Sequence, residues 1–126
     1  MNILGLDHIN ISGPAALIEN CRRFYVETLG LREGPRPPFR SHGFWLYAGE
    51  QAIVHLTEKE RETAVRDDSA FDHCALRCSG LRKTIERFKT LGVLYTLKEV
   101  PDTGDVQIFV SDPGGLRLEL NFRGGE

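Results

Sequence analysis

The sequence lacks the features that would tie it to a membrane or to a nucleic acid. No apolar run approaches the roughly 20 residues that a membrane-spanning helix needs. No basic stretch followed by a long apolar one opens the chain, so we expect no signal peptide. Lysine and arginine are scattered and the formal net charge is −2, whereas nucleic-acid binding needs a clustered basic face. We therefore expect neither nucleic acid nor membrane among the partners.

Cysteine is scarce as well. The three cysteines, Cys21, Cys74 and Cys78, are odd in number and form no C-x-x-C pair. Such a set is typical of reduced thiols, so we expect a cytoplasmic protein. With 40% hydrophobic and 27% charged residues, the composition is that of an ordinary globular chain, and 126 residues can bury a core without disulfides.

What the sequence does contain is a repeat. "GLDHINISG" begins at Gly5 and "AFDHCALRCSG" at Ala70, and each places an Asp-His pair at the start of an apolar run that alternates as a β-strand does. A helix-like stretch follows each run, and three short strand-like pieces follow each helix. Since one such unit buries too little core to be stable alone, we expect the two to pair into a single α+β domain.

The boundaries of the units follow from the same pattern. We expect a first module at 1–57, a charged connector at 58–69 and a second module at 70–126. The expected elements are a strand over 3–12, a helix over 13–30 and strands over 31–39, 43–49 and 51–57, then a strand over 71–79, a helix over 80–92 and strands over 93–100, 105–111 and 116–122. The expected inward helix positions are Leu17, Cys21, Phe24, Thr28 and Leu29, then Leu81, Ile85, Phe88 and Leu91. "DPGG" at 112–115 predicts a tight turn.

Histidines fall on three of the expected strands, at His8, His55 and His73. Each points to the opposite face from its aliphatic neighbours, and so does Glu119 in the last strand. A lone strand histidine is more commonly a core or surface residue than a ligand, but a carboxylate centred in so apolar a strand needs a partner, because burying it alone is costly. The repeat pairs His8 with His73 and His55 with Glu119, so the four can converge on one metal ion. His42, in a polar loop, is expected to be solvated.

Three imidazoles and one carboxylate form a donor set that suits a divalent transition metal. Zn, Ni, Co, Mn or Fe fits this set better than Ca or Mg, which prefer oxygen ligands alone. Octahedral coordination would leave two positions open, enough for a substrate that binds through two oxygens. Tetrahedral coordination would fill the site and indicate a structural zinc.

The motifs "LDHINI", "FYVETLGL", "IVHL", "FDHCAL" and "FVSDPGGLRLEL" together resemble the vicinal oxygen chelate superfamily, which holds glyoxalase I, extradiol dioxygenases, methylmalonyl-CoA epimerase, and fosfomycin- and bleomycin-resistance proteins. The resemblance covers nearly the whole chain. It implies two βαβββ modules that form an open eight-stranded barrel around a divalent metal. The ligands that it implies are His8, His55, His73 and Glu119.

Departures from individual members leave the reaction open. Glyoxalase I has a carboxylate or Gln at the position of His55, and its glutathione-binding segments are missing from this sequence. Fosfomycin-resistance enzymes carry Tyr where Phe109 lies, and bleomycin-sequestering members lack the metal ligands. Extradiol dioxygenases use two histidines and a glutamate, matched by His8, His73 and Glu119. We expect a lyase or isomerase that acts on a small substrate with vicinal oxygens; the alternatives are an Fe(II) dioxygenase and a non-catalytic drug-binding protein.

The glyoxalase resemblance implies that Glu119 acts as the catalytic base if it leaves the metal during turnover, and His55 is the second candidate. Strand parity places further side chains where they can bind substrate, with plain barrel lining as the alternative: Asn10, Gln107, Phe109, Arg117 and Asn121. Trp45 and Tyr47, on the aromatic strand, could form the wall of an apolar substrate pocket or could instead anchor a dimer interface. Arg40 could meet an acidic substrate group, although we expect it to be exposed.

Beyond the small-molecule substrate, the expected partner is a second copy of the chain. Short members of the superfamily often exchange modules within a homodimer. One site could then take His8 and His55 from one chain and His73 and Glu119 from the other.

Overall fold

The computed structural model describes residues 1–60 and 70–126 and divides into two compact units, Met1–Ala64 and Val65–Glu126. Most of the predicted connector at 58–69 lies outside the described residues. At its start, Glu58 still belongs to a strand. Within the described residues no helix is long and apolar enough to cross a membrane.

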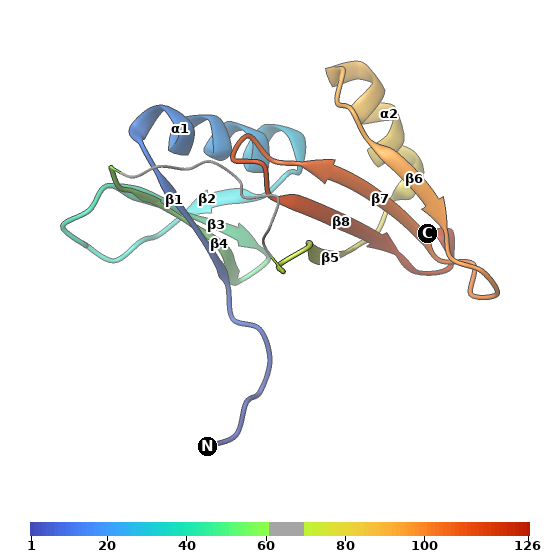
Figure 1. Cartoon of the computed structure of the whole chain (residues 1–126), viewed down its shortest axis with the longest axis horizontal. Helices are drawn as coiled ribbons and strands as arrows, with labels where there is room; N and C mark the ends of the chain where they lie inside the picture. The colour runs from blue at the N-terminus through green and yellow to red at the C-terminus, as the bar shows by residue number, and fades with distance from the viewer. Residues whose placement is uncertain (61–69) are drawn as a thin grey trace. The chain divides into compact units, whose positions relative to one another are not determined.

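Both units have the predicted order of one strand, one helix and three strands (Figure 1). The first contains β1 (Ile9–Gly13), α1 (Ala15–Arg23), a π-helical turn η1 (Phe24–Thr28), β2 (Arg32–Gly34), β3 (Gly43–Ala48) and β4 (Gln51–Glu58). The second contains β5 (Cys74–Cys78), α2 (Leu81–Leu91), β6 (Thr96–Glu99), β7 (Val106–Ser111), β8 (Arg117–Phe122) and a 3-10 turn η2 (Arg123–Gly125). The predicted α+β class and the two βαβββ modules are confirmed.

The two sheets have the same topology and register. Their strand orders are β1-β4-β3-β2 and β5-β8-β7-β6, with the first and last strand of each unit parallel and adjacent. Ile9 is paired with Val54 in one sheet as Cys74 is paired with Leu118 in the other. The histidine of each Asp-His pair therefore lies one residue before its first strand, and His55 and Glu119 hold equivalent positions in the last strands.

The core of the first unit lies between its helix and one face of its sheet. α1 contacts β1, β3 and β4. Val54 and Leu56 are fully buried on either side of His55, which confirms the predicted alternation of β4. The predicted inward stripe of the helix is wrong except at Cys21: the buried residues are Ile18, Cys21 and Tyr25. The helix ends in a π-helical turn, which changes the spacing from Phe24 onward, where Thr28 and Leu29 were predicted to face inward.

In the second unit α2 is held mainly through Phe88, its only buried residue. Leu91, predicted to face inward, is 50% exposed in the last turn before the Gly92 cap. β7 and β8 supply most of the buried apolar side chains: Val106, Ile108, Val110, Leu118, Leu120 and Phe122. The predicted turn between them is confirmed, since the Leu116 amide donates to Asp112 Oδ1 at 2.9 Å.

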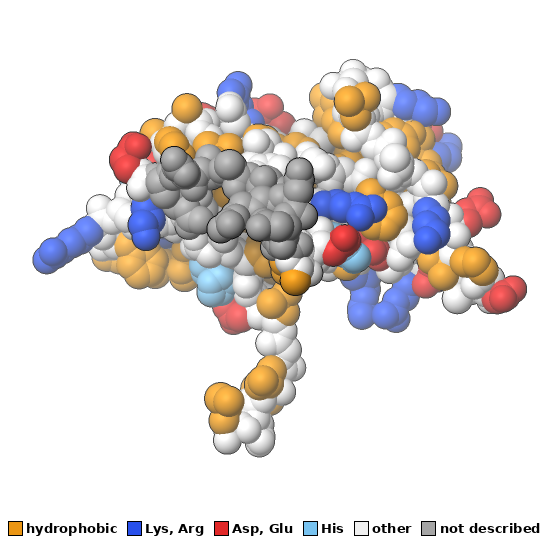
Figure 2. Space-filling model, in the orientation of Figure 1, with side chains coloured by type: hydrophobic (Ala, Val, Ile, Leu, Met, Phe, Trp, Pro, Cys, Tyr) orange, Lys and Arg blue, Asp and Glu red, His pale blue; other side chains and the backbone are white. Residues whose placement is uncertain are grey.

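The first predicted strand is too long. β1 begins at Ile9 rather than at residue 3, and the apolar side chains of Met1, Ile3, Leu4 and Leu6 are exposed on a segment that extends away from its unit (Figures 1 and 2). In the parallel register Leu6 would lie opposite Gln51, the first residue of β4. No strand in the described part of the chain lies beside the residues before Leu6, and a strand needs a paired neighbour.

Gly43 at the start of β3 gives the first testable prediction. A Cβ there would lie 2.1 Å from the Leu56 carbonyl oxygen and 3.0 Å from Arg36 Nη2. Because the closer obstacle is backbone, Gly43→Ala should lower the free energy of unfolding by about 2 kcal/mol or more, measured by urea denaturation. Gly114→Ala is the control, since its Cβ would meet only the Asp112 side chain, at 3.3 Å. Equal losses for the two variants would contradict this expectation.

Candidate functional site

In the first unit the structure brings His8 and His55 together. Their rings are stacked with centroids 3.7 Å apart, and the Trp45 ring covers the other side of His55 at 4.1 Å. The strand register explains why these rings lie side by side. His55 is paired with Asn10 of β1 and with Trp45 of β3, so the three side chains share one face of the sheet. His55 is 8% exposed, and burial holds its pKa below the usual value, with the nearby His8 as the next cause. Its imidazole is therefore neutral near pH 7, the form that binds metals.

In the second unit the structure brings His73 and Glu119 together. Glu119 is 6% exposed, and its Oε2 lies 3.1 Å from His73 Nε2. Its Oε1 accepts hydrogen bonds from Gln107 Nε2 at 2.8 Å and from Asn121 Nδ2 at 3.1 Å. Phe109 is paired with Glu119 across β7 and β8, and its ring lies edge-to-face with that of His73 at 6.1 Å. Two of the predicted substrate-binding residues, Gln107 and Asn121, thus hold the carboxylate.

The repeated Asp-His pairs give both units the same histidine geometry. His8 Nδ1 donates to Asp7 Oδ2 at 2.5 Å, and His73 Nδ1 donates to Asp72 Oδ1 at 2.7 Å. A carboxylate that accepts from one ring nitrogen fixes the tautomer and leaves the other nitrogen as a ligand, which is the usual arrangement around metal-binding histidines. The sequence prediction missed this role of the aspartates, although their position before each histidine is the signal that carries it.

The two aspartates differ in their surroundings. Arg117 Nη1 lies 3.2 Å from Asp72 Oδ1. The hydrogen bond from His73 is the largest cause that holds the pKa of Asp72 below its usual value, and the charge of Arg117 adds to it. His55 is preceded by Val54 rather than by an aspartate, and the Ala52 backbone and the charge of Asp7 offset part of the lowering of its pKa.

Each unit by itself brings together two of the four predicted ligands. Within residues 1–60 and 70–126, no three His, Cys, Asp or Glu side chains form a group that could hold a metal ion. The full ligand set of His8, His55, His73 and Glu119 therefore stays a prediction. All three cysteines are thiols rather than disulfides, and Cys21 and Cys74 are buried.

Next to the histidines of the first unit lies a pocket of about 450 Å³. It is lined by Asp7, His8, Asn10, Arg36, Phe39, Ser41, Trp45, His55 and Thr57. Asn10 donates to Thr57 Oγ1 at 3.0 Å on its floor. Tyr47 lies apart from it, at the β2–β3 pair, where its hydroxyl donates to the Pro35 carbonyl at 2.6 Å. Arg36 and Phe39 were not predicted, because an irregular loop carries no periodicity that reveals which side chains turn inward.

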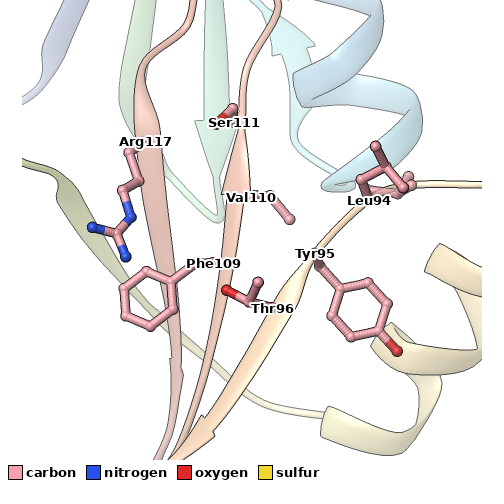
Figure 3. A pocket seen from close by; sticks show the side chains of 8 residues that line it. Leu94, Tyr95, Thr96, Phe109, Val110, Ser111 and Arg117 are labelled. Carbon is pink, nitrogen blue, oxygen red and sulfur yellow. The ribbon is translucent and has the colours of Figure 1, made fainter. Parts of the chain in front are cut away.

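The second unit has a pocket of about 700 Å³ (Figure 3). It is lined by Val93, Leu94, Tyr95, Thr96, Phe109, Val110, Ser111 and Arg117. Two of these, Phe109 and Arg117, are predicted substrate-binding residues, and the Arg117 guanidinium lies over the Phe109 ring at 4.4 Å. This stacking, together with the ion pair to Asp72, fixes Arg117 beside the Asp72–His73 pair.

No family model matches the sequence, and no curated protein sequence matches it either. Solved structures do match. A structure from Bacillus anthracis described as a glyoxalase family protein has a TM-score of 0.77 at 24% identity and covers 98% of each chain. A glyoxalase family protein from Enterococcus faecalis has a TM-score of 0.70 at 25% identity, covering 96% of this chain and 99% of that one. A glyoxylase/bleomycin resistance protein/dioxygenase domain from Frankia sp. has a TM-score of 0.76 at 18% identity, covering 97% and 99%.

These likenesses cover 96–98% of this chain and so extend over both units. At such identities they establish the fold rather than a reaction or a substrate. The chain has the glyoxalase-like fold that these solved structures share.

Proposed function

We propose that the chain is a divalent-metal-dependent enzyme of the glyoxalase type, which acts on a small substrate bound through two neighbouring oxygens. His8, His55, His73 and Glu119 would hold one transition-metal ion. The supporting observation is the matched geometry of the two units, in which a histidine anchored by its own aspartate lies against the central residue of the last strand.

The donor atoms fit such an ion. Nδ1 of His8 and of His73 is engaged by an aspartate, so Nε2 of each remains as the ligand atom. Glu119 is buried, with Oε1 held by two amide donors and Oε2 directed toward His73. Nearby, Asn121 Oδ1 is buried and accepts no hydrogen bond from the described residues, so it can accept one from a substrate hydroxyl. Zn, Ni, Co, Mn or Fe suits this set of nitrogen and oxygen donors.

When bound, the metal would stabilise the negative charge that develops on a substrate oxygen. Glu119, if it leaves the metal during turnover, would take the proton from the carbon next to the substrate carbonyl and return it to the carbonyl carbon. Gln107 and Asn121 fix Oε1, which orients Oε2 for that transfer. His55, neutral because it is buried, is the second candidate for the base. Trp45 covers one side of the His55 ring and keeps water from it.

The test of this function is turnover by metal-loaded protein. Hemithioacetals, α-hydroxyketones and catechols each carry vicinal oxygens and report lyase, isomerase and dioxygenase chemistry respectively. We expect turnover of one of the first two classes, lost on chelation and restored by adding metal back. Oxygen uptake with catechols and Fe(II) would identify the dioxygenase instead, with His8, His73 and Glu119 as its ligands. Metal-independent binding without turnover would indicate the non-catalytic alternative and contradict the proposal.

Asp72→Asn should weaken metal binding by about 10- to 100-fold, because it removes the carboxylate that orients His73 and raises its basicity. Competition with a chromophoric chelator measures the affinity. Asp102→Asn is the matched control: Asp102 is exposed, with a φ of 65° that Asn also adopts readily. An unchanged affinity in Asp72→Asn would show that the aspartate does not support a ligand.

We further propose a homodimer in which the ligand pairs of two chains complete each other's site. The test is complementation between His8→Ala and His73→Ala, each of which should bind no metal alone. In module-exchanged dimers refolded from an equal mixture, about half of the dimers are mixed and each contains one intact site, so about a quarter of the wild-type metal content should return. No recovery, or a monomer by size-exclusion chromatography, would contradict the exchange.

A further inference from the structure

Among the described residues, Arg36 has no counter-ion in the pocket that holds His8 and His55. Its Nη1 donates to the Ser41 carbonyl at 2.9 Å and its Nη2 to Ser41 Oγ at 3.3 Å. Its Nε is buried and has no hydrogen-bond partner among the described residues, nor does any described carboxylate form an ion pair with this guanidinium. A guanidinium that lines a pocket without a carboxylate partner favours a ligand that supplies the negative charge.

The surroundings hold Arg36 in place. Gly43 allows the close approach, because a Cβ there would lie 3.0 Å from Arg36 Nη2. The guanidinium lies over the Phe39 ring at 4.9 Å, and Phe39 lies 6.2 Å from the ring of Trp45. The one acidic side chain of the pocket, Asp7, is paired with His8. A cation, an aromatic wall and two imidazoles therefore line one pocket of about 450 Å³.

We propose that this pocket binds a small organic anion with a planar apolar group, in which Arg36 pairs with a carboxylate and the rings of Phe39 and Trp45 contact the planar part. A guanidinium forms paired hydrogen bonds with a carboxylate, and flat aromatic faces favour a flat ligand. The inference rests on the proposed function in that the same pocket contributes His8 and His55 to the metal. It narrows the substrate class to aromatic or unsaturated carboxylic acids.

The only tryptophan of the chain, Trp45, lines this pocket and reports binding through its fluorescence. Chelator-treated protein is titrated with benzoate and with benzamide, which has the same shape without the charge. We expect a saturable change with benzoate and an affinity for benzamide about tenfold weaker or more. Arg36→Gln should reduce benzoate affinity to that of benzamide while leaving benzamide unchanged. Arg40→Gln, on the same loop but exposed and outside the pocket, should bind benzoate as the wild type does.

Equal binding of benzoate and benzamide by the wild-type protein would overturn the proposal even if Arg36→Gln failed to fold. A similar loss in Arg40→Gln would overturn it as well, because the effect would then be one of overall charge. Absence of any saturable change with benzoate would also overturn it. Since these titrations use metal-free protein, their failure and the failure of metal binding are separate results.

Discussion

Replacing Glu119 by glutamine should remove both the bound metal and the activity. Glutamine has the shape of glutamate but brings an NH₂ group where Gln107 and Asn121 now donate to Oε1. Turned the other way, its NH₂ group takes the place of Oε2, which lies 3.1 Å from His73 Nε2. Either orientation removes the anionic ligand and the base, so turnover of the accepted substrate should fall by about 10²- to 10⁴-fold. Metal content, measured by inductively coupled plasma mass spectrometry, should fall from one ion per chain toward none.

Glu99→Gln is the matched control for this variant. Glu99 is exposed at the end of β6 and is placed in neither of the proposed ligand pairs. The Glu99→Gln variant undergoes the same change of charge as Glu119→Gln but at a site that holds no metal ligand. Its metal content and turnover should therefore equal those of the wild type. If Glu119→Gln kept its metal and lost only activity, Glu119 would be a base but not a ligand; if it kept both, the proposed site would be wrong.

Of the substitutions considered for their effect on stability, Phe88→Ala should lower the free energy of unfolding the most. Phe88 is 1% exposed, it is the only buried residue of α2, and its ring packs near that of Tyr95 at 5.7 Å. Removing a buried phenylalanine leaves a cavity that the neighbours fill only in part, so the free energy of unfolding should fall by about 3–5 kcal/mol. Urea denaturation followed by circular dichroism measures the loss.

The control for Phe88→Ala lies one helical turn further along α2. Leu91 shares the predicted inward face but is 50% exposed, so Leu91→Ala should cost about 1 kcal/mol or less. Equal losses in the two variants would mean that Leu91 is buried in solution. The exposed position of the last turn would then be wrong.

The sequence predicts on which face of each sheet the proposed ligands lie, because side chains alternate between the two faces of a strand with a period of two. Val54 and Leu56 are buried on one side of β4, which places His55 on the other side, and Leu118 and Leu120 do the same for Glu119. The equivalence of the two units followed from the duplicated pattern alone. Its structural counterpart is the shared register of the parallel strand pairs.

What could not be predicted depends on contacts distant in sequence. The alternating pattern over 3–12 does not show where the neighbouring strand β4 begins or ends. The predicted first strand therefore begins at residue 3, whereas β1 begins at Ile9. A π-helical turn changes the phase of an apolar stripe, so the predicted positions Thr28 and Leu29 could not be placed by a regular helical period. Arg36 enters the pocket from a proline-rich loop, where no pattern separates an inward side chain from a solvated one.

Anomalous diffraction from crystals grown with Ni²⁺ or Zn²⁺ tests the metal centre most directly. We predict one anomalous peak per chain, at about 2.0–2.2 Å from a ring nitrogen of His8, His55 and His73 and from a carboxylate oxygen of Glu119. The ligands would come from one chain or from two. A peak held by only one of the two pairs, with the other imidazoles directed elsewhere, would contradict a shared ion and leave a duplicated fold without the proposed chemistry.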